Sequence, residues 1–410
     1  MIAAGFAPFG RLECRFTPAG IQAALRALLL LQALGFAFMV AGTHGVFAPQ
    51  TAPPTTTDFA SFYAAGRLAS QGRPSAAYSP VDHLTAERQA VAPGVDEKRF
   101  LNPPVFLLLC APLARLPYLP AFLLFEAATA CVWLALVTRI AGGGTLAALG
   151  MAAIPSVWWT LGWGQNAFLS AGLMGAGTAL LRRRPWLAGA AFGALCFKPH
   201  FGILIPVALV AGRHWRALAG ATASLAVLTG LSAICFGVAA WKAFAGAAFD
   251  AGAAVQTSAQ LAARVDLRGA ARLLGMALGP SWAFQAAGTL AAAAVVAWLW
   301  ARAPATHPLR PGRHEAACAG LVAGTLAAMP FVLFYDLVMA GVAAAWLVRA
   351  ARSQGWRVGE WSGLGICLAL DLFAYPAACS LHLAIAAAVS PILLWLAVDR
   401  SRSVKPSVAI

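Results

Sequence analysis

Residues 185–212 read PWLAGAAFGALCFKPHFGILIPVALVAG and are flanked on both sides by arginines. These 28 residues are too few for two full membrane-spanning helices, which need about 40 residues. Lys198 and Pro199 interrupt the stretch near its middle, and proline breaks helices. The stretch therefore predicts a hairpin of two short helices with Lys198, Pro199 and His200 at its tip. Irregular backbone at membrane depth is tolerated only inside protein or beside a wet cavity, so we expect the tip to face such a cavity.

The whole chain shares this apolar character. Of its 410 residues, 61% are hydrophobic and only 10% are charged, whereas soluble domains carry about 25% charged residues. Apolar runs of about 15–25 residues recur, which is the length of a membrane-spanning helix, and the alternating segments of a membrane barrel are absent. The composition therefore predicts an all-α, polytopic integral membrane protein with a bundle of about eleven or twelve membrane segments.

The net charge is +15, and the arginines gather in short loops between the apolar runs. That distribution is typical of cytoplasmic loops and of contact with anionic lipids, so we predict membrane lipids and no nucleic acid as partners. The eight cysteines include no CxxC pair and no pairing with histidine at zinc spacing, and no D-x-D pair occurs. We therefore predict no metal and no cofactor, with a metal shared by Asp58 and Asp336 as the alternative if the two carboxylates approach each other.

The charge pattern also orients the chain. We predict a single transmembrane domain, 1–410, whose residues 1–20 are cytoplasmic because arginines precede the first apolar run. Two outer loops are predicted, at residues 48–102 and 239–278. In the first of them, the acidic and basic charges balance, as is typical of a loop on the outer side. Later arginine clusters, such as residues 182–184, are predicted to be cytoplasmic.

Simple alternation between the two sides fails in one region. Four apolar runs lie between the first outer loop and residues 182–184, where an odd number of crossings is required. The run 103–116 is too short to cross a membrane untilted, so we predict that it re-enters the membrane. Within the first outer loop, 59–70 and 81–91 have helical character, and we expect them to lie in the membrane interface.

This topology gathers polar side chains near the outer face. Charged residues inside membrane segments are costly and usually functional. A carboxylate can act as general base on an acceptor hydroxyl, a lysine or histidine can hold a phosphate leaving group, and a groove between helices can hold a lipid tail. Transfer of a sugar from a polyprenyl-phosphate donor needs all three. The gathered residues are Asp58, Tyr63, Tyr78, Asn102, Gln165, Asn166, Lys198, His200 and Asp336.

Four motifs in order along the chain resemble glycosyltransferase family 87, integral membrane enzymes with the C-type glycosyltransferase fold. The family includes polyprenyl-phosphate-mannose-dependent mannosyltransferases. The resemblance covers about residues 22–400. The motifs are DFASFYAAGRLASQG at 58–72, LNPPVFLLLCAPLARLPY at 101–118, the segment 162–218 with its Gly-Gln, Lys-Pro and terminal basic residues, and PFVLFYDLVMAGVA at 330–343.

The resemblance implies an inverting transfer of a mannose-like hexose from polyprenyl phosphate to a glycolipid or polysaccharide acceptor. It implies that Asp58 is the catalytic base, with Lys198 and His200 as candidates to hold the donor phosphate. Composition rich in alanine and arginine is typical of GC-rich bacterial genomes, so the expected site is the outer face of a bacterial inner membrane. The expected substrate-binding residues are Tyr63, Tyr78, Gln165, Asn166 and Asp336.

Each assignment has a structural alternative. Asp58 precedes a helical stretch and is a good helix N-cap. Lys198 is also explained as a lysine that extends from a helix end to the interface, and Asp336 as a polar link between helices. For the whole chain, the alternatives are a transporter or flippase of a lipid-linked sugar precursor, or a non-catalytic membrane assembly partner.

Overall fold

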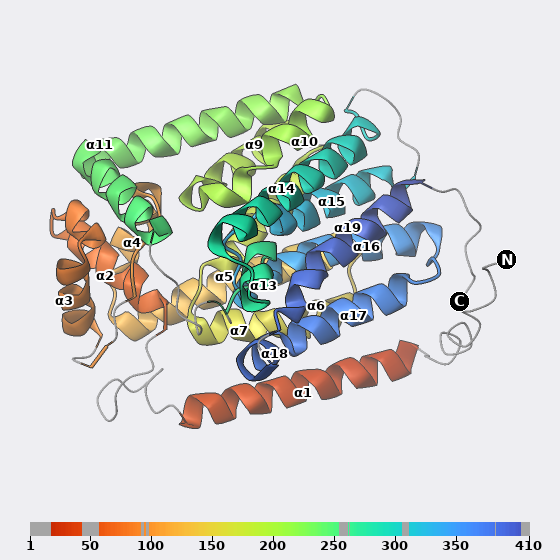
Figure 1. Ribbon diagram of the computed structural model, residues 1–410, viewed down its shortest axis with the longest axis horizontal. Coiled ribbons are helices and arrows are strands. Elements are labelled where there is room, and N and C mark those ends of the chain that lie inside the picture. Colours follow the sequence, from red (N-terminus) through yellow and green to blue (C-terminus); the bar gives the residue numbers. More distant parts are fainter. Residues whose placement is uncertain are drawn as a thin grey trace.

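The protein is built from helices, as a computed structural model shows for residues 18–42, 57–91, 94–95, 98–253, 261, 263–305, 311–381 and 383–402 (Figure 1). The described residues contain no strand, although an isolated bridge joins Arg264 and Leu333. The predicted cytoplasmic segment lies almost wholly outside the described residues. So do residues 48–56 and 254–260 of the two predicted outer loops.

The first half of the chain contains α1 (Pro18–Gly42), α2 (Phe59–Ser70), η3 (Pro74–Tyr78), α3 (Pro80–Ala90), η4 (Pro104–Phe106), α4 (Leu107–Leu113), α5 (Tyr118–Ile140), α6 (Thr145–Ala152), α7 (Pro155–Trp163), α8 (Ala167–Leu180), α9 (Pro185–Ala194), η5 (Leu195–Phe197), η6 (Pro199–Gly202) and α10 (Ile205–Ala211). The second half contains α11 (Trp215–Ala253), α13 (Leu267–Leu273), α14 (Leu278–Ala301), α15 (Arg313–Ala328), η7 (Phe334–Met339), α16 (Ala340–Gln354), α17 (Glu360–Leu372), α18 (Ala374–Leu381), η8 (Ile385–Ala388) and α19 (Val389–Arg402).

Within the described residues, five helices are long and apolar enough to cross a membrane, and the bent pair α6–α7 makes a sixth. The prediction of an all-α polytopic membrane protein is thus confirmed. Membrane-length helices are fewer than the eleven or twelve segments predicted, because several apolar runs form short helices such as α8, α9 and α10.

Helix α5 defines the two ends of the bundle. At its start, the Tyr118 hydroxyl lies 2.9 Å from Oγ1 of Thr57, next to Asp58. At its end, the Ile140 carbonyl accepts a hydrogen bond of 3.3 Å from Arg349. A helix of 23 residues is about 34 Å long. We call these two ends the Asp58 end and the arginine end.

The structure resolves the crossing problem between residues 103 and 181. Arg139, at the close of α5, lines the same cavity as Arg182, which follows α8. Both helices therefore finish at the arginine end, and the bent pair α6–α7 runs between them, with a 55° bend. The run 103–116 forms only η4 and the seven-residue α4, in agreement with the prediction of a short segment.

Residues 185–212 form the predicted hairpin of two short helices. Helix α9 ends in η5, Lys198 adopts a non-helical conformation (φ −130°, ψ 72°), and η6 and α10 follow. Gly189 faces Ala217 of α11, and Gly193 faces Ala221, so α9 and α11 run in the same direction. Since α10 connects them, it must return toward the arginine end, and the Lys198 break is the tip.

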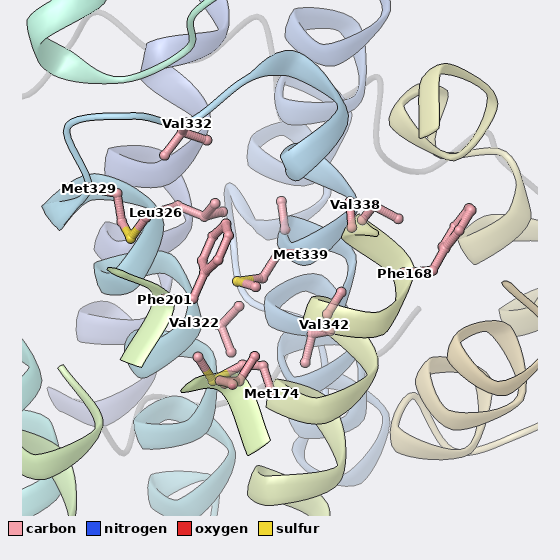
Figure 2. Packing of buried hydrophobic residues seen from close by; sticks show 14 of the residues in the cluster. Phe168, Met174, Phe201, Val322, Leu326, Met329, Val332, Val338, Met339 and Val342 are labelled. Atoms are coloured by element: carbon pink, nitrogen blue, oxygen red, sulfur yellow. The ribbon is translucent and has the colours of Figure 1, made fainter. Parts of the chain in front are cut away.

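The tip is anchored in the core of the bundle. Figure 2 shows Phe201, two residues past Pro199, among Val322, Leu326, Met329 and Met339. Helix α15 is buried from Ala316 to Ala328, and small residues there let its neighbours approach closely, as is common between membrane helices. The core therefore fixes where Lys198 lies.

Two long helices lie at the periphery (Figure 1). Helix α1 has no buried residue in its most apolar window and is tied to the bundle by Gln32, which donates to the Ala153 carbonyl at 3.1 Å. Helix α11 kinks at Gly237, whose φ of 76° favours glycine. Beyond the kink, residues predicted as the second outer loop continue as helix to Ala253 and pack against the first outer segment.

The two expected interfacial helices form as α2 and α3, but α2 does not lie on a surface. Every residue from Phe59 to Ala69 except Arg67 is buried. Gly66 explains the close packing, because a Cβ there would lie 2.2 Å from the Cys110 carbonyl oxygen of α4. The expectation that α2 lies in the interface is therefore wrong, and Asp58 stands at the start of a buried helix.

Candidate active site

The backbone around Asp58 is fixed by the end of α7. The Asp58 N–H donates to the Trp163 carbonyl at 2.7 Å. The next residue, Gly164, has a left-handed conformation (φ 63°), and a Cβ there would lie 2.9 Å from both Phe59 and Phe122. Glycine is therefore required by conformation and by space at this position. The contact joins α2, α5 and α7 beside Asp58.

The Asp58 carboxylate does not cap its helix within the described part of the chain. Instead, Oδ2 accepts a hydrogen bond of 2.5 Å from Nε2 of Gln165, and Oδ1 lies 3.8 Å from Nζ of Lys98. The side chain is 19% exposed, so it is recessed but open to a small solute. This geometry removes the N-cap alternative and supports the predicted proximity of Gln165.

Burial dominates the electrostatics of this carboxylate. It raises the pKa of Asp58 above the ordinary value, while the positive charge of Lys98, the hydrogen bond from Gln165 and the more distant charge of Lys198 oppose the rise. Desolvation disfavours the charged form, which explains the direction. A carboxylate with a raised pKa is a stronger base, and that suits general base catalysis.

Lys98 is a residue that the sequence analysis did not single out. His83 donates from Nε2 to the Lys98 carbonyl at 3.0 Å, and Oε2 of Glu87 accepts from the Lys98 N–H at 3.2 Å. His83 and Glu87 are four residues apart on α3 and are both buried. They hold the backbone on both sides of Lys98, so its ammonium reaches Asp58. The His-x-x-x-Glu spacing on a predicted helix was the available signal.

A second charged centre lies at the hairpin tip. Nζ of Lys198 lies 3.1 Å from Oδ1 of Asp336, and both side chains are almost fully buried. The ammonium also lies over the rings of Phe201 and Tyr335, at 5.3 and 5.9 Å from their centroids. The structure thus brings together two predicted residues that are 138 positions apart. Lys198 does not extend to a surface.

Residues 263–266, in the second predicted outer loop, make hydrogen bonds that hold the turn before Asp336 in place. Val265 donates to the Val332 carbonyl at 2.9 Å, and Phe334 donates to the Ala263 carbonyl at 3.1 Å. Asp266 accepts from the Val332 N–H at 3.3 Å and pairs with buried Arg264 at 2.9 Å. Burial raises the pKa of Asp266, and Arg264 opposes the rise.

Aromatic rings connect the two centres. The Trp163 ring lies 5.6 Å from Nζ of Lys98 and also packs edge-on against Phe334 at 5.6 Å. Phe334 immediately precedes the pair Tyr335 and Asp336. The contact of Trp163 with Phe334 thus joins the two centres, and the charge of Lys198 also opposes the raised pKa of Asp58.

Two predicted substrate residues use their hydroxyl groups within the protein. Tyr63 donates to the Leu116 carbonyl at 2.7 Å, and Tyr78 donates to the Asn102 carbonyl at 2.9 Å. Burial raises the pKa of both phenols, so they stay neutral donors. Contact with substrate would use their rings or the lone pairs of the phenol oxygens, which can still accept a hydrogen bond.

Asn166 and His200 are not brought to either carboxylate by a hydrogen bond among the described residues. The Asn166 amide is fully buried, and neither its oxygen nor its nitrogen has a partner in that part of the chain. His200 packs against Phe201, with ring centroids 4.9 Å apart. Their predicted contacts with substrate therefore stay predictions.

A cavity of about 320 Å³ lies beside the first predicted outer loop. Its walls come from η3, the start of α3, residues 99–101 and the part of α11 beyond the kink. The polar groups that line it include Tyr78, His83, Arg99 and Asp250. Its volume is in the range of small-ligand sites. Neither in this cavity nor in the rest of the described residues do three His, Cys, Asp or Glu side chains gather as a metal site.

The fold and this site define an integral membrane protein with a recessed carboxylate and a buried ammonium at one end of a helical bundle. The sequence profile of glycosyltransferase family 87 matches residues 100–333, more than half of the chain. The chain belongs to this family and is a membrane glycosyltransferase. No curated protein and no solved structure matches it. The matched residues contain Gln165 and Lys198, while Asp58 precedes them and Asp336 follows them.

Proposed function

We propose that the protein transfers a mannose-like hexose from a polyprenyl-phosphate donor to a glycolipid or polysaccharide acceptor. Transfer would occur at the outer face of a bacterial inner membrane, with inversion at the anomeric carbon and Asp58 as base. The observation that carries the proposal is the Asp58 carboxylate, recessed beside Gln165 and Lys98 and electrostatically coupled to Lys198.

In the proposed step, the acceptor oxygen bonds to the anomeric carbon while its proton passes to Asp58. The bond from that carbon to the phosphate oxygen breaks, and polyprenyl phosphate leaves with the electron pair. Asp58 then releases the proton to water. One base and a stabilised leaving group suffice for a single inverting displacement, so no second carboxylate is needed as a nucleophile.

The two lysines suit different roles in this displacement. Inversion requires the base and the leaving group on opposite faces of the anomeric carbon. Lys98 lies 3.8 Å from Asp58, on the side of the base, so it tunes the carboxylate. Lys198 is farther away, and its pair with Asp336 holds a charge in a low-dielectric site where it can stabilise a departing phosphate. His200 follows at the same tip and is the second candidate.

The cavity beside the loop is proposed as the acceptor site. His83 lines it and also holds the backbone of Lys98, whose ammonium faces Asp58, so an acceptor bound there would extend toward the base. Tyr78 supplies part of the wall, and the far half of α11 supplies Asp250. The second predicted outer loop would then help to choose the acceptor.

The direct test supplies the purified protein in lipid nanodiscs with polyprenyl-phosphate mannose and a bacterial glycolipid acceptor. We expect a new glycosidic bond whose anomeric configuration, measured by NMR, is opposite to that of the donor. A product with the donor's configuration, or transfer from a nucleotide sugar alone, would contradict the proposal.

The Asp58–Lys98 contact predicts a pH effect. A base must be deprotonated, so activity falls as the pH drops through the pKa of Asp58. Lys98→Met removes the charge that lowers this pKa, so the acidic limb of log kcat/KM should move to higher pH. Lys98→Arg keeps the charge and is the matched control, with its limb unmoved. An unmoved limb in Lys98→Met would reject either the contact or the base.

A further inference from the structure

A second cavity lies at the arginine end, on the opposite side of the bundle from Asp58. Its volume is about 420 Å³, which is in the range of small-ligand sites. The ends of α5 and α8, the start of α15 and the last turns of α16 form its walls. Four arginines line it against one glutamate, namely Arg139, Arg182, Arg183 and Arg349 against Glu315.

The positive charges in this cavity are poorly compensated. Glu315 lies 3.9 Å from Arg349, and Arg349 also donates to the Ile140 carbonyl. Arg139, Arg182 and Arg183 are exposed at the mouth of the cavity, and their guanidinium groups make no hydrogen bond or ion pair to a residue that the structure describes. Like charges held together repel one another, and an anion between them would relieve that repulsion.

The shape of the site favours a phosphate rather than a diffuse cloud of ions. The arginines come from three separate helix ends and face one hollow, so their planar donors can converge on one group. Leu136, Ile140, Ala179 and Trp346 supply the apolar part of the cavity's lining. A ligand with a phosphate and a short apolar or glycerol portion fits both parts.

We propose that this cavity binds a phosphate-bearing ligand at the arginine end, either a phospholipid headgroup or a free organic phosphate. The site is about 30 Å from Asp58, given the length of α5, so it is separate from the proposed transfer reaction. Arginine clusters also orient membrane proteins without binding a specific ligand, and the experiment must distinguish that effect.

The test uses the purified full chain in neutral detergent. Binding of phosphatidylglycerol, with phosphatidylcholine as reference, is measured by native mass spectrometry, and binding of glycerol 1-phosphate by calorimetry. We expect Arg182→Gln with Arg183→Gln to weaken phosphate binding by about tenfold or more, because charge-assisted hydrogen bonds are lost. The matched control, Arg184→Gln with Arg216→Gln, removes two exposed charges that do not line the cavity, and it should change affinity less than about twofold.

Comparison of the two ligands identifies the source of the phosphate. Binding of phosphatidylglycerol alone assigns a lipid headgroup, and binding of glycerol 1-phosphate with the same dependence on Arg182 and Arg183 assigns a free phosphate. Equal losses in the two double variants would show general surface electrostatics and overturn the proposal. Wild-type protein that binds neither of the two anionic phosphate ligands more tightly than zwitterionic phosphatidylcholine, whose phosphate is neutralised by its own ammonium group, would overturn it as well.

Discussion

Asp58→Asn should lower sugar transfer by about a hundredfold to ten-thousandfold, which is the usual contribution of a general base. Asparagine keeps the size of the side chain but cannot take the acceptor proton. The carboxylate does not cap α2, so folding should be nearly unaffected. The measurement is kcat/KM for the reconstituted enzyme with the polyprenyl-phosphate donor, beside thermal unfolding of the same preparation.

Asp82→Asn is the matched control. Asp82 lies on the same predicted outer loop, has a side chain that is 42% exposed, and pairs with Arg73 at 2.6 Å. Exposed ion pairs contribute little to stability, so activity and unfolding temperature should both stay near wild type. Full turnover in Asp58→Asn would exclude this residue as the base, and equal losses in both variants would point to disruption of the loop.

The hairpin was predictable because its constraints are local. Two arginine clusters fix both ends of residues 185–212, and Pro199 fixes the break between them. The same logic predicted the short segment before α5, where length alone excludes a crossing. The charge pattern also predicted that Asp58 and Lys198 lie on the same side of the membrane.

The partners of those residues were not predictable in the same way. Lys98 was one of several balancing charges in a loop, and only the fold shows that α3 presents it to Asp58. The pairing of Lys198 with Asp336 depends on how the hairpin and the turn before α16 pack. Sequence periodicity does not encode such contacts, which join positions 138 residues apart.

The burial of α2 was missed for a different reason. Its apolar periodicity indicates one buried face, yet the opposite face is buried too, because Gly66 lets the backbone of α4 approach. In membrane proteins, small residues mark helix contacts as strongly as large apolar ones. An amphipathic pattern therefore does not separate a helix in the interface from one inside the bundle.

Lys198→Met should damage both stability and transfer. It leaves Asp336 buried without its ammonium partner, and breaking a buried ion pair typically costs about 3–5 kcal/mol. The double variant Lys198→Met with Asp336→Leu removes both charges, so the free energy of unfolding should recover much of that loss. If the Lys198–Asp336 pair acts on the substrate, with Lys198 holding the leaving phosphate, transfer should stay about a hundredfold or more below wild type in the double variant.

The buried pair of Arg400 and Glu360 at the arginine end provides the matched control. Both side chains are almost fully buried, and they are remote from Asp58. Arg400→Met with Glu360→Leu should resemble the Lys198 double variant in unfolding temperature while transfer stays near wild type. A Lys198 double variant with recovered stability and full transfer would show that this ammonium only supports the fold. The phosphate would then need another cation, and His200 at the same tip would be the next to replace.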